Sequence, residues 1–128
     1  MKLKVLMVIN AVLSAVFGIA FVLVPGRVIS LYDVQPNPPL EYVGQLFGSA
    51  LIAFAILTWL ARNAPDSAAR RAIVLALLVS FAVGFVVSLI GQLGGVVNAL
   101  GWSTVVIYLV FTLGYGYFQF VKRSDQQP

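Results

Sequence analysis

Four long apolar segments dominate this 128-residue sequence and constrain its fold more than any other feature. Each is close to the roughly 20 residues that a helix needs to cross the hydrocarbon core of a bilayer. Hydrophobic residues make up 61% of the chain and charged residues 9%, which is outside the range of a soluble globular domain. Because the backbone of a membrane span must satisfy its own hydrogen bonds, helices are expected. We therefore predict an all-α fold, an integral membrane antiparallel four-helix bundle that forms a single membrane domain over 1–128, with spans at about 4–24, 41–62, 70–93 and 96–121.

The basic residues are unevenly distributed among the segments that connect these spans. Every lysine and arginine except Arg27 lies before the first span, in or beside the link 63–69, or after the last span. The positive-inside rule places such segments in the cytoplasm. This predicts both termini inside, a cytoplasmic turn at 63–69 and a short cytoplasmic tail at 122–128, in the inner (plasma) membrane of a bacterium. In the turn, Asp66 or Ser67 is expected to cap the third span.

The external connector 25–40 interrupts the apolar pattern and holds most of the prolines. Its first half, from Val28 to Tyr32, spaces apolar residues as in a short helix that lies in the external interface. Its second half, Gln35–Pro39, is expected to run extended until Glu41 opens the second span, because proline fixes φ and lacks an N–H. The pattern predicts a stiff connector that covers the external mouth of the bundle.

Small and polar residues lie on one face of each span, where they permit close approach of helices in a bilayer. Asn10, in the inner third of the first span, is expected to fix register by a contact with the second or fourth span. The residues predicted to pack helix against helix lie on the second and third spans: Gly44, Gly48, Ser80, Gly84 and Ser88.

The fourth span carries the longest polar ladder, which begins after Gly101. Two interpretations stay open, helix packing or the lining of a solute path, and the absence of charged residues within the spans favours packing. Tyrosines of the ladder also suit stacking on a quinone or a lipid tail. Its members recur every three or four residues: Thr104, Tyr108, Thr112, Tyr115 and Gln119.

A second candidate site lies at the external mouth of the bundle. Gln45, Gln92 and Asn98 fall at one depth, about one turn from the external helix ends. They suit either a hydrogen-bonded layer that satisfies helix ends or a site for a quinone or lipid. Three further residues are expected just above them: Arg27, Glu41 and Tyr42.

The composition also excludes several kinds of chemistry. The sequence contains no cysteine and no histidine, which removes disulfides, thiolate nucleophiles and the usual zinc and haem ligands. No catalytic residues, metal site or cofactor are therefore expected. Membrane lipid, other membrane subunits or further copies of the chain are the expected partners. Nucleic acid is not an expected partner, because the basic residues lie at helix ends.

These features favour a non-catalytic membrane protein that acts as an accessory or assembly subunit or as a homo-oligomer. Two alternatives stay open. The first is a passive channel or carrier for a small neutral or hydrophobic solute. The second is a quinone- or lipid-binding protein with its site at the external mouth.

Short motifs spread over most of the chain carry a family resemblance. They are Val24-Pro25-Gly26-Arg27 with Leu31-Tyr32, Gly48-x-x-Leu51, Trp59-Leu60-Ala61-Arg62, Arg70-Arg71 and Asn98-x-x-Gly101-Trp102. In these motifs the sequence resembles the DoxX-like group of small four-helix bacterial membrane proteins. The resemblance implies a four-helix fold and, for the few members linked to thiosulfate or quinone oxidation, work as a subunit with partners. It assigns no catalytic residue to any position here.

Overall fold

The computed structural model describes residues 2–121, and within this range it contains helices and no strand. Four of the helices are long and apolar enough to span a membrane. The predicted tail 122–128 lies outside the described residues. In chain order the helices are α1 (Leu3–Leu23), α2 (Pro25–Leu31), α3 (Pro38–Ala61), α4 (Ala68–Leu93) and α5 (Gly101–Phe120).

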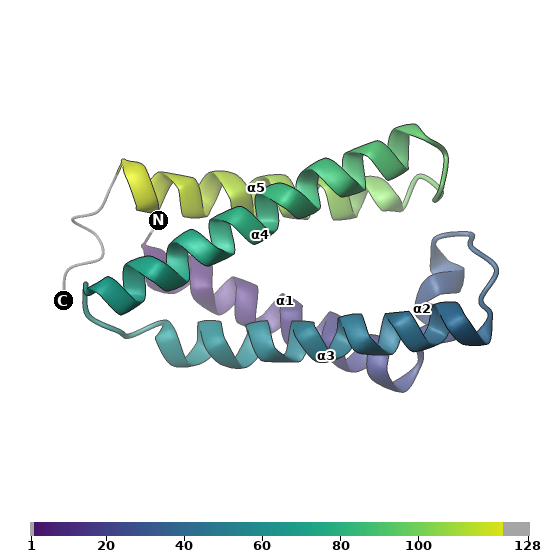
Figure 1. The fold of residues 1–128 in the computed structure, drawn as a ribbon, viewed down its shortest axis with the longest axis horizontal. Coiled ribbons are helices and arrows are strands. Elements are labelled where there is room, and N and C mark those ends of the chain that lie inside the picture. Colours follow the sequence, from purple (N-terminus) through teal and green to yellow (C-terminus); the bar gives the residue numbers. More distant parts are fainter. Residues whose placement is uncertain (1, 122–128) are drawn as a thin grey trace.

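The long helices are arranged as two pairs, α1 with α3 and α4 with α5 (Figure 1). The start of α1, the α3–α4 link and the last turn of α5 lie together at one end of the molecule, on the left of the view, which we call the termini end. The short helix α2 and the α4–α5 link lie at the opposite end, which we call the α2 end. Contacts between the pairs come mainly from α1 and α5.

The α1 and α3 backbones approach each other closely where two glycines meet. A Cβ atom at Gly48 would lie 2.7 Å from the carbonyl oxygen of Gly18, and one at Gly18 would lie 2.9 Å from that of Gly48. Gly44, one turn away, is less crowded, because its nearest neighbour would be Phe21 Cδ1 at 3.4 Å. The pair therefore depends on the absence of side chains at Gly18 and Gly48.

The hydrophobic core lies toward the termini end, where all four long helices contribute buried side chains. Phe81 of α4 stacks on Phe111 and Tyr115 of α5, with ring centroids 4.9 and 5.9 Å apart. Gly114 makes room for Leu6, since a Cβ atom at Gly114 would lie 2.8 Å from Leu6 Cδ2. The buried cluster consists of Leu3, Leu6, Met7, Ala61, Val74, Leu77, Phe81, Phe111, Tyr115 and Phe118.

Two helix starts differ from the sequence prediction. The expectation that the chain stays extended until Glu41 is wrong from Pro38 onward, because α3 begins there. Asn37 accepts a hydrogen bond from the amide of Leu40 at 2.9 Å, and a proline in the first helical turn lacks only an N–H that would have no helical partner. The fourth span was predicted from residue 96, but α5 begins at Gly101.

Local hydrogen bonds at the other connections agree with the sequence. The side chain of Ser67 accepts from the amide of Arg70 at 3.2 Å, which confirms one of the two predicted caps. In the same link the Arg70 guanidinium donates to the Ala64 carbonyl at 2.6 Å, and Arg71 pairs with Asp66 at 3.0 Å. The predicted short helix in the connector is present as α2.

Candidate functional site

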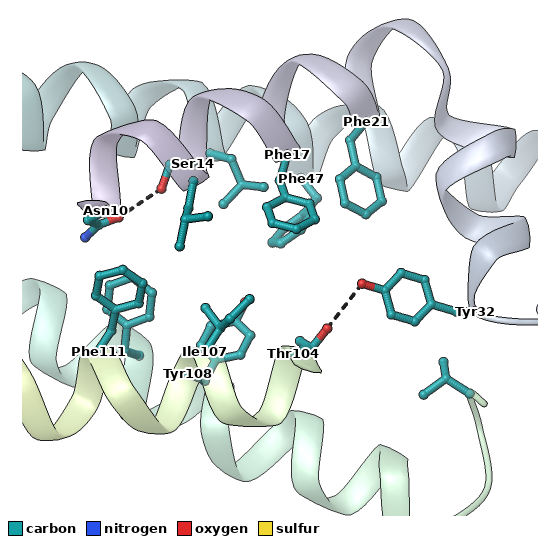
Figure 2. Close-up of a pocket in the computed structure, with 14 residues that line it drawn as sticks. Asn10, Ser14, Phe17, Phe21, Tyr32, Phe47, Thr104, Ile107, Tyr108 and Phe111 are labelled. Atoms are coloured by element: carbon teal, nitrogen blue, oxygen red, sulfur yellow. Dashed lines mark hydrogen bonds between the residues drawn. The ribbon is translucent and has the colours of Figure 1, made fainter. Parts of the chain in front are cut away.

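Between the core and the α2 end, the two helix pairs enclose a cavity of ≈ 290 Å³, which we call the main cavity. Figure 2 shows α1 on one side of it and α5 on the other, with side chains from both pointing into the space between. Its wall is mostly aromatic and aliphatic, and includes Leu13, Phe17, Phe21, Phe47, Ile107 and Phe111. The cavity therefore presents apolar surface along most of its length.

The main cavity is not fully enclosed by the helices. Phe17 of α1 and Phe47 of α3 both line it, and they remain 36% and 42% exposed. A chain that spans a membrane has lipid at such a surface. A molecule in the membrane can thus reach the cavity from the surface of the helices.

A buried polar network lies at the end of the main cavity nearest the core. Asn10 Nδ2 donates to the hydroxyl oxygen of Tyr115 at 2.7 Å, and Ser14 Oγ donates to Asn10 Oδ1 at 2.9 Å. All three side chains are buried. The predicted contact of Asn10 with the fourth long helix is confirmed, because Tyr115 belongs to α5.

The α2 end of the main cavity is lined by Tyr32, the residue that follows α2. Its hydroxyl lies 3.3 Å from Thr104 Oγ1 on α5, so the two side chains meet across the space between the helix pairs (Figure 2). Asn98 holds this segment in place, since its backbone N–H donates to the Tyr32 carbonyl at 3.1 Å and its Nδ2 to the Leu31 carbonyl at 3.0 Å. The α4–α5 link is thereby attached to the end of α2.

Beyond this pair lies a smaller cavity of ≈ 170 Å³, which we call the second cavity. Tyr32, Val97 and Thr104 line both cavities, so the two adjoin. Gln92 and Gly101 belong to the second cavity alone. Within residues 2–121 neither cavity is lined by a charged side chain.

The structure places the residues predicted at the external mouth in two groups. Gln92 and Asn98 are joined, because Gln92 Nε2 donates to the Asn98 carbonyl at 3.1 Å. Gln45 belongs to the other helix pair, where its Nε2 donates to the Val22 carbonyl near the end of α1 at 3.1 Å. No hydrogen bond among the described residues joins Gln45 to the first group.

The other residues predicted at this mouth lie around α2. The Glu41 carboxylate lies beside Gly26, where a Cβ atom would approach its Oε1 to 2.8 Å. The side chains of Arg27 and Tyr42 are exposed. Arg27 belongs to α2 itself, and none of the three residues lines either cavity.

The polar ladder of the fourth span is divided between the two regions. Thr104 and Tyr108 line the main cavity, and the ring of Tyr108 occupies the space that a side chain at Gly84 would need. Tyr115 and Gln119 are buried toward the termini end. Thr112 lies between these two parts of the ladder, and its hydroxyl donates to the carbonyl of Tyr108 at 2.6 Å within its own helix.

Among the described residues, the two serines predicted to pack helices together form no hydrogen bond to another helix. Ser88 Oγ donates to the Phe85 carbonyl of its own helix at 3.1 Å, and its side chain lines the second cavity. Ser80 is half-buried. On this face of α4, Gly84 is the residue that permits close contact with α5.

The aromatic wall of the main cavity is not among the sites predicted from the sequence. Phe17 and Phe21 are four residues apart and so lie on one face of α1. In a membrane span, however, an aromatic face turned toward lipid has the same pattern as one turned toward a cavity. Only the positions of α3 and α5 distinguish the two cases.

Comparison of the chain with protein-family models, with curated proteins and with solved structures gave no match. The interpretation of the site therefore depends on its own geometry. Among the described residues there is no group of three or more His, Cys, Asp or Glu side chains placed to hold a metal ion. What the site offers is an apolar interior with hydroxyl and amide groups at both ends.

Proposed function

We propose that this chain is a non-catalytic accessory protein of the bacterial inner membrane that binds a long apolar molecule between its two helix pairs. Four helices apolar enough to span a membrane support the membrane location. The distribution of basic residues supports an antiparallel bundle with both termini in the cytoplasm and α2 at the external surface. The short motifs that resemble those of the DoxX-like group are compatible with a subunit that works beside other membrane proteins or further copies of itself.

The main cavity is the observation that carries the proposal. From Asn10 to Phe21 its wall follows α1 for ~16 Å, at the helical rise of ~1.5 Å per residue. A cavity of ≈ 290 Å³ that extends along this length of helix is elongated rather than round. The shape suits an acyl chain or the isoprenoid tail of a lipid or quinone.

The energetics of a bilayer favour such an occupant. Lipid tails are as apolar as the cavity wall, so transfer from the membrane gains little from the hydrophobic effect. Selectivity must come from close van der Waals contact with a fixed shape and from hydrogen bonds at its ends. Both are present here, since aromatic side chains form the wall and Tyr32 and Thr104 lie at the α2 end.

The alternative of a passive solute path is less well supported by the same geometry. Toward the termini end the main cavity stops at side chains that are almost fully buried, Phe111 and Tyr115 among them. Conduction across the membrane would require this core to open. Binding of a chain from the side requires no such change.

The proposal is tested by filling the main cavity. Ile107→Trp places a large ring in it, whereas Val110→Trp on the same helix puts the same ring on an exposed surface. The protein is extracted in mild detergent, and bound lipids are identified by native mass spectrometry. We expect wild type and Val110→Trp to retain a chain-bearing lipid, and Ile107→Trp to lose it while its helix content is unchanged. Equal retention in all three proteins would contradict the proposal.

A further inference from the structure

Gln92, which lines the second cavity, carries a hydrogen-bond acceptor that has no partner among residues 2–121. Gln92 Nε2 donates to the backbone carbonyl of Asn98, and a carbonyl can only accept, so the orientation of this side-chain amide is fixed. Its Oε1 is consequently turned away from Asn98. That atom is buried and receives no hydrogen bond. A buried acceptor in this state is unfavourable unless something donates to it.

The surroundings of this oxygen leave room for it, and no described group donates a hydrogen bond to it. Oε1 occupies the space where a side chain at Gly101 would begin, so the glycine permits its position. The hydroxyl of Ser88, which also lines the second cavity, is already used on the Phe85 carbonyl. A cavity of ≈ 170 Å³ beside such an atom is large enough for a small polar group.

The second cavity adjoins the main cavity at the Tyr32–Thr104 pair. Their hydroxyl oxygens are 3.3 Å apart, a long separation for two hydroxyl groups, and each can donate or accept. The polar side chains from the main cavity toward the second cavity are therefore the two hydroxyls and then Gln92. These polar groups lie where the head of an amphiphile is expected when its tail occupies the main cavity.

We propose that Gln92 recognises the uncharged, hydrogen-bond-donating headgroup of a single-chain amphiphile, such as a long-chain or isoprenoid alcohol, whose tail occupies the main cavity. This inference rests on the proposed function and specifies its ligand. A donor is required because the free group of Gln92 is an acceptor. An anionic head does not fit, since no cationic side chain lines either cavity among the described residues. An oxidised quinone does not fit either, because its ring oxygens only accept.

The test compares two probes that differ in one donor. Farnesol and farnesyl methyl ether have the same tail, and only the alcohol can donate. The purified full-length protein in lipid nanodiscs is given an equimolar mixture of both, and the bound ratio is measured by mass spectrometry after washing. One additional hydrogen bond predicts roughly a tenfold preference for the alcohol in wild type. In Gln92→Leu the ratio is expected to fall to about one while the ether still binds.

Matched variants separate this acceptor from other amides and from folding defects. Gln45→Leu removes an amide of the other helix pair and should keep the wild-type ratio. Gly101→Ala keeps the amide of Gln92 but displaces its oxygen, so it should lower the ratio even if Gln92→Leu does not fold. Equal binding of both probes to wild type would overturn the inference, with the second cavity then holding water, and would leave the proposed function standing. A preference for the alcohol that persists in both Gln92→Leu and Gly101→Ala would also overturn it. Binding of neither probe would overturn the proposed function as well.

Discussion

The two ends of this molecule are built from the same kinds of residue but pack in different ways. At the termini end Leu6 is 2% exposed and fits against Gly114, so side chains from both helix pairs interlock. Toward the α2 end Phe17 and Phe47 line a cavity and remain partly exposed. Both regions are aliphatic and aromatic. Hydrophobicity alone therefore does not determine which one is filled.

The connections between helices account for part of the difference. At the termini end α3 and α4 are joined by a short link in which Arg70 and Arg71 bond back to Ala64 and Asp66. At the α2 end a separate helix follows α1, and Asn98 attaches its last residues to the α4–α5 link. The α2 segment thus stands between the helix pairs and is bonded to one of them through Asn98.

The bilayer explains why such a gap is tolerated. In water, an apolar cavity open to solvent would be unfavourable and the pairs would tend to collapse onto one another. In a membrane a lipid chain that entered the gap would supply contacts similar to those of a packed side chain. A loosely packed half is therefore compatible with a stable fold, provided that the other half holds the pairs together.

The largest expected effect comes from truncating one leucine at each end. Leu6→Ala removes a fully buried side chain from the core and should lower the free energy of unfolding by about 3 kcal/mol, because the interlocked helices cannot close the space. Leu51→Ala, at the main cavity, should cost about 1 kcal/mol or less, because that side chain already borders a gap. Unfolding by sodium dodecyl sulfate in mixed micelles, followed by circular dichroism, measures both. Equal costs would mean that the two ends are packed alike.

Much of the helical framework could be predicted because it depends on local sequence. The four spans follow from apolar length, and Ser67 and the short helix α2 follow from capping and spacing. The start of α3 differs from the prediction, because Pro38 and Pro39 indicate an extended segment when their place in a helix is not known. Their position in the first turn, after the cap at Asn37, makes them compatible with one.

The cavities could not be predicted, because they depend on how the helix pairs are placed. Gln45 and Gln92 were expected at one depth, yet depth does not specify which helices are neighbours. Gln45 bonds to α1 and Gln92 to the α4–α5 link. The polar ladder of α5 can likewise be predicted from the three- or four-residue spacing of its members. That Tyr108 lines the main cavity while Tyr115 lies in the core depends on how α5 contacts α1.

A second, smaller effect tests whether the α1–α3 pair is fixed by one glycine contact. Gly48→Ala introduces a Cβ atom 2.7 Å from a backbone oxygen that cannot move aside independently, so we expect a loss of roughly 1 to 2 kcal/mol from overpacking. Gly44→Ala is the matched control one turn away, where the nearest atom would be 3.4 Å from the new Cβ, and it should be close to neutral. The same unfolding assay applies. A destabilising Gly44→Ala together with a neutral Gly48→Ala would show that the helices meet elsewhere.

The smallest expected effect compares a tyrosine hydroxyl at each end. Tyr115→Phe deletes the partner of Asn10 in a buried bond of 2.7 Å, and it should cost between the ~0.6 kcal/mol average and the ~1.7 kcal/mol maximum known for polar contacts between membrane helices. Tyr32→Phe deletes a longer contact of 3.3 Å beside a cavity, and its cost should fall below ~0.5 kcal/mol. Because the rings remain in both variants, the difference isolates the hydroxyl groups. If Tyr32→Phe proved the more costly of the two, polar contacts would hold the α2 end together. The gap between the helix pairs would then be a rigid part of the fold that keeps its shape without a lipid chain inside it.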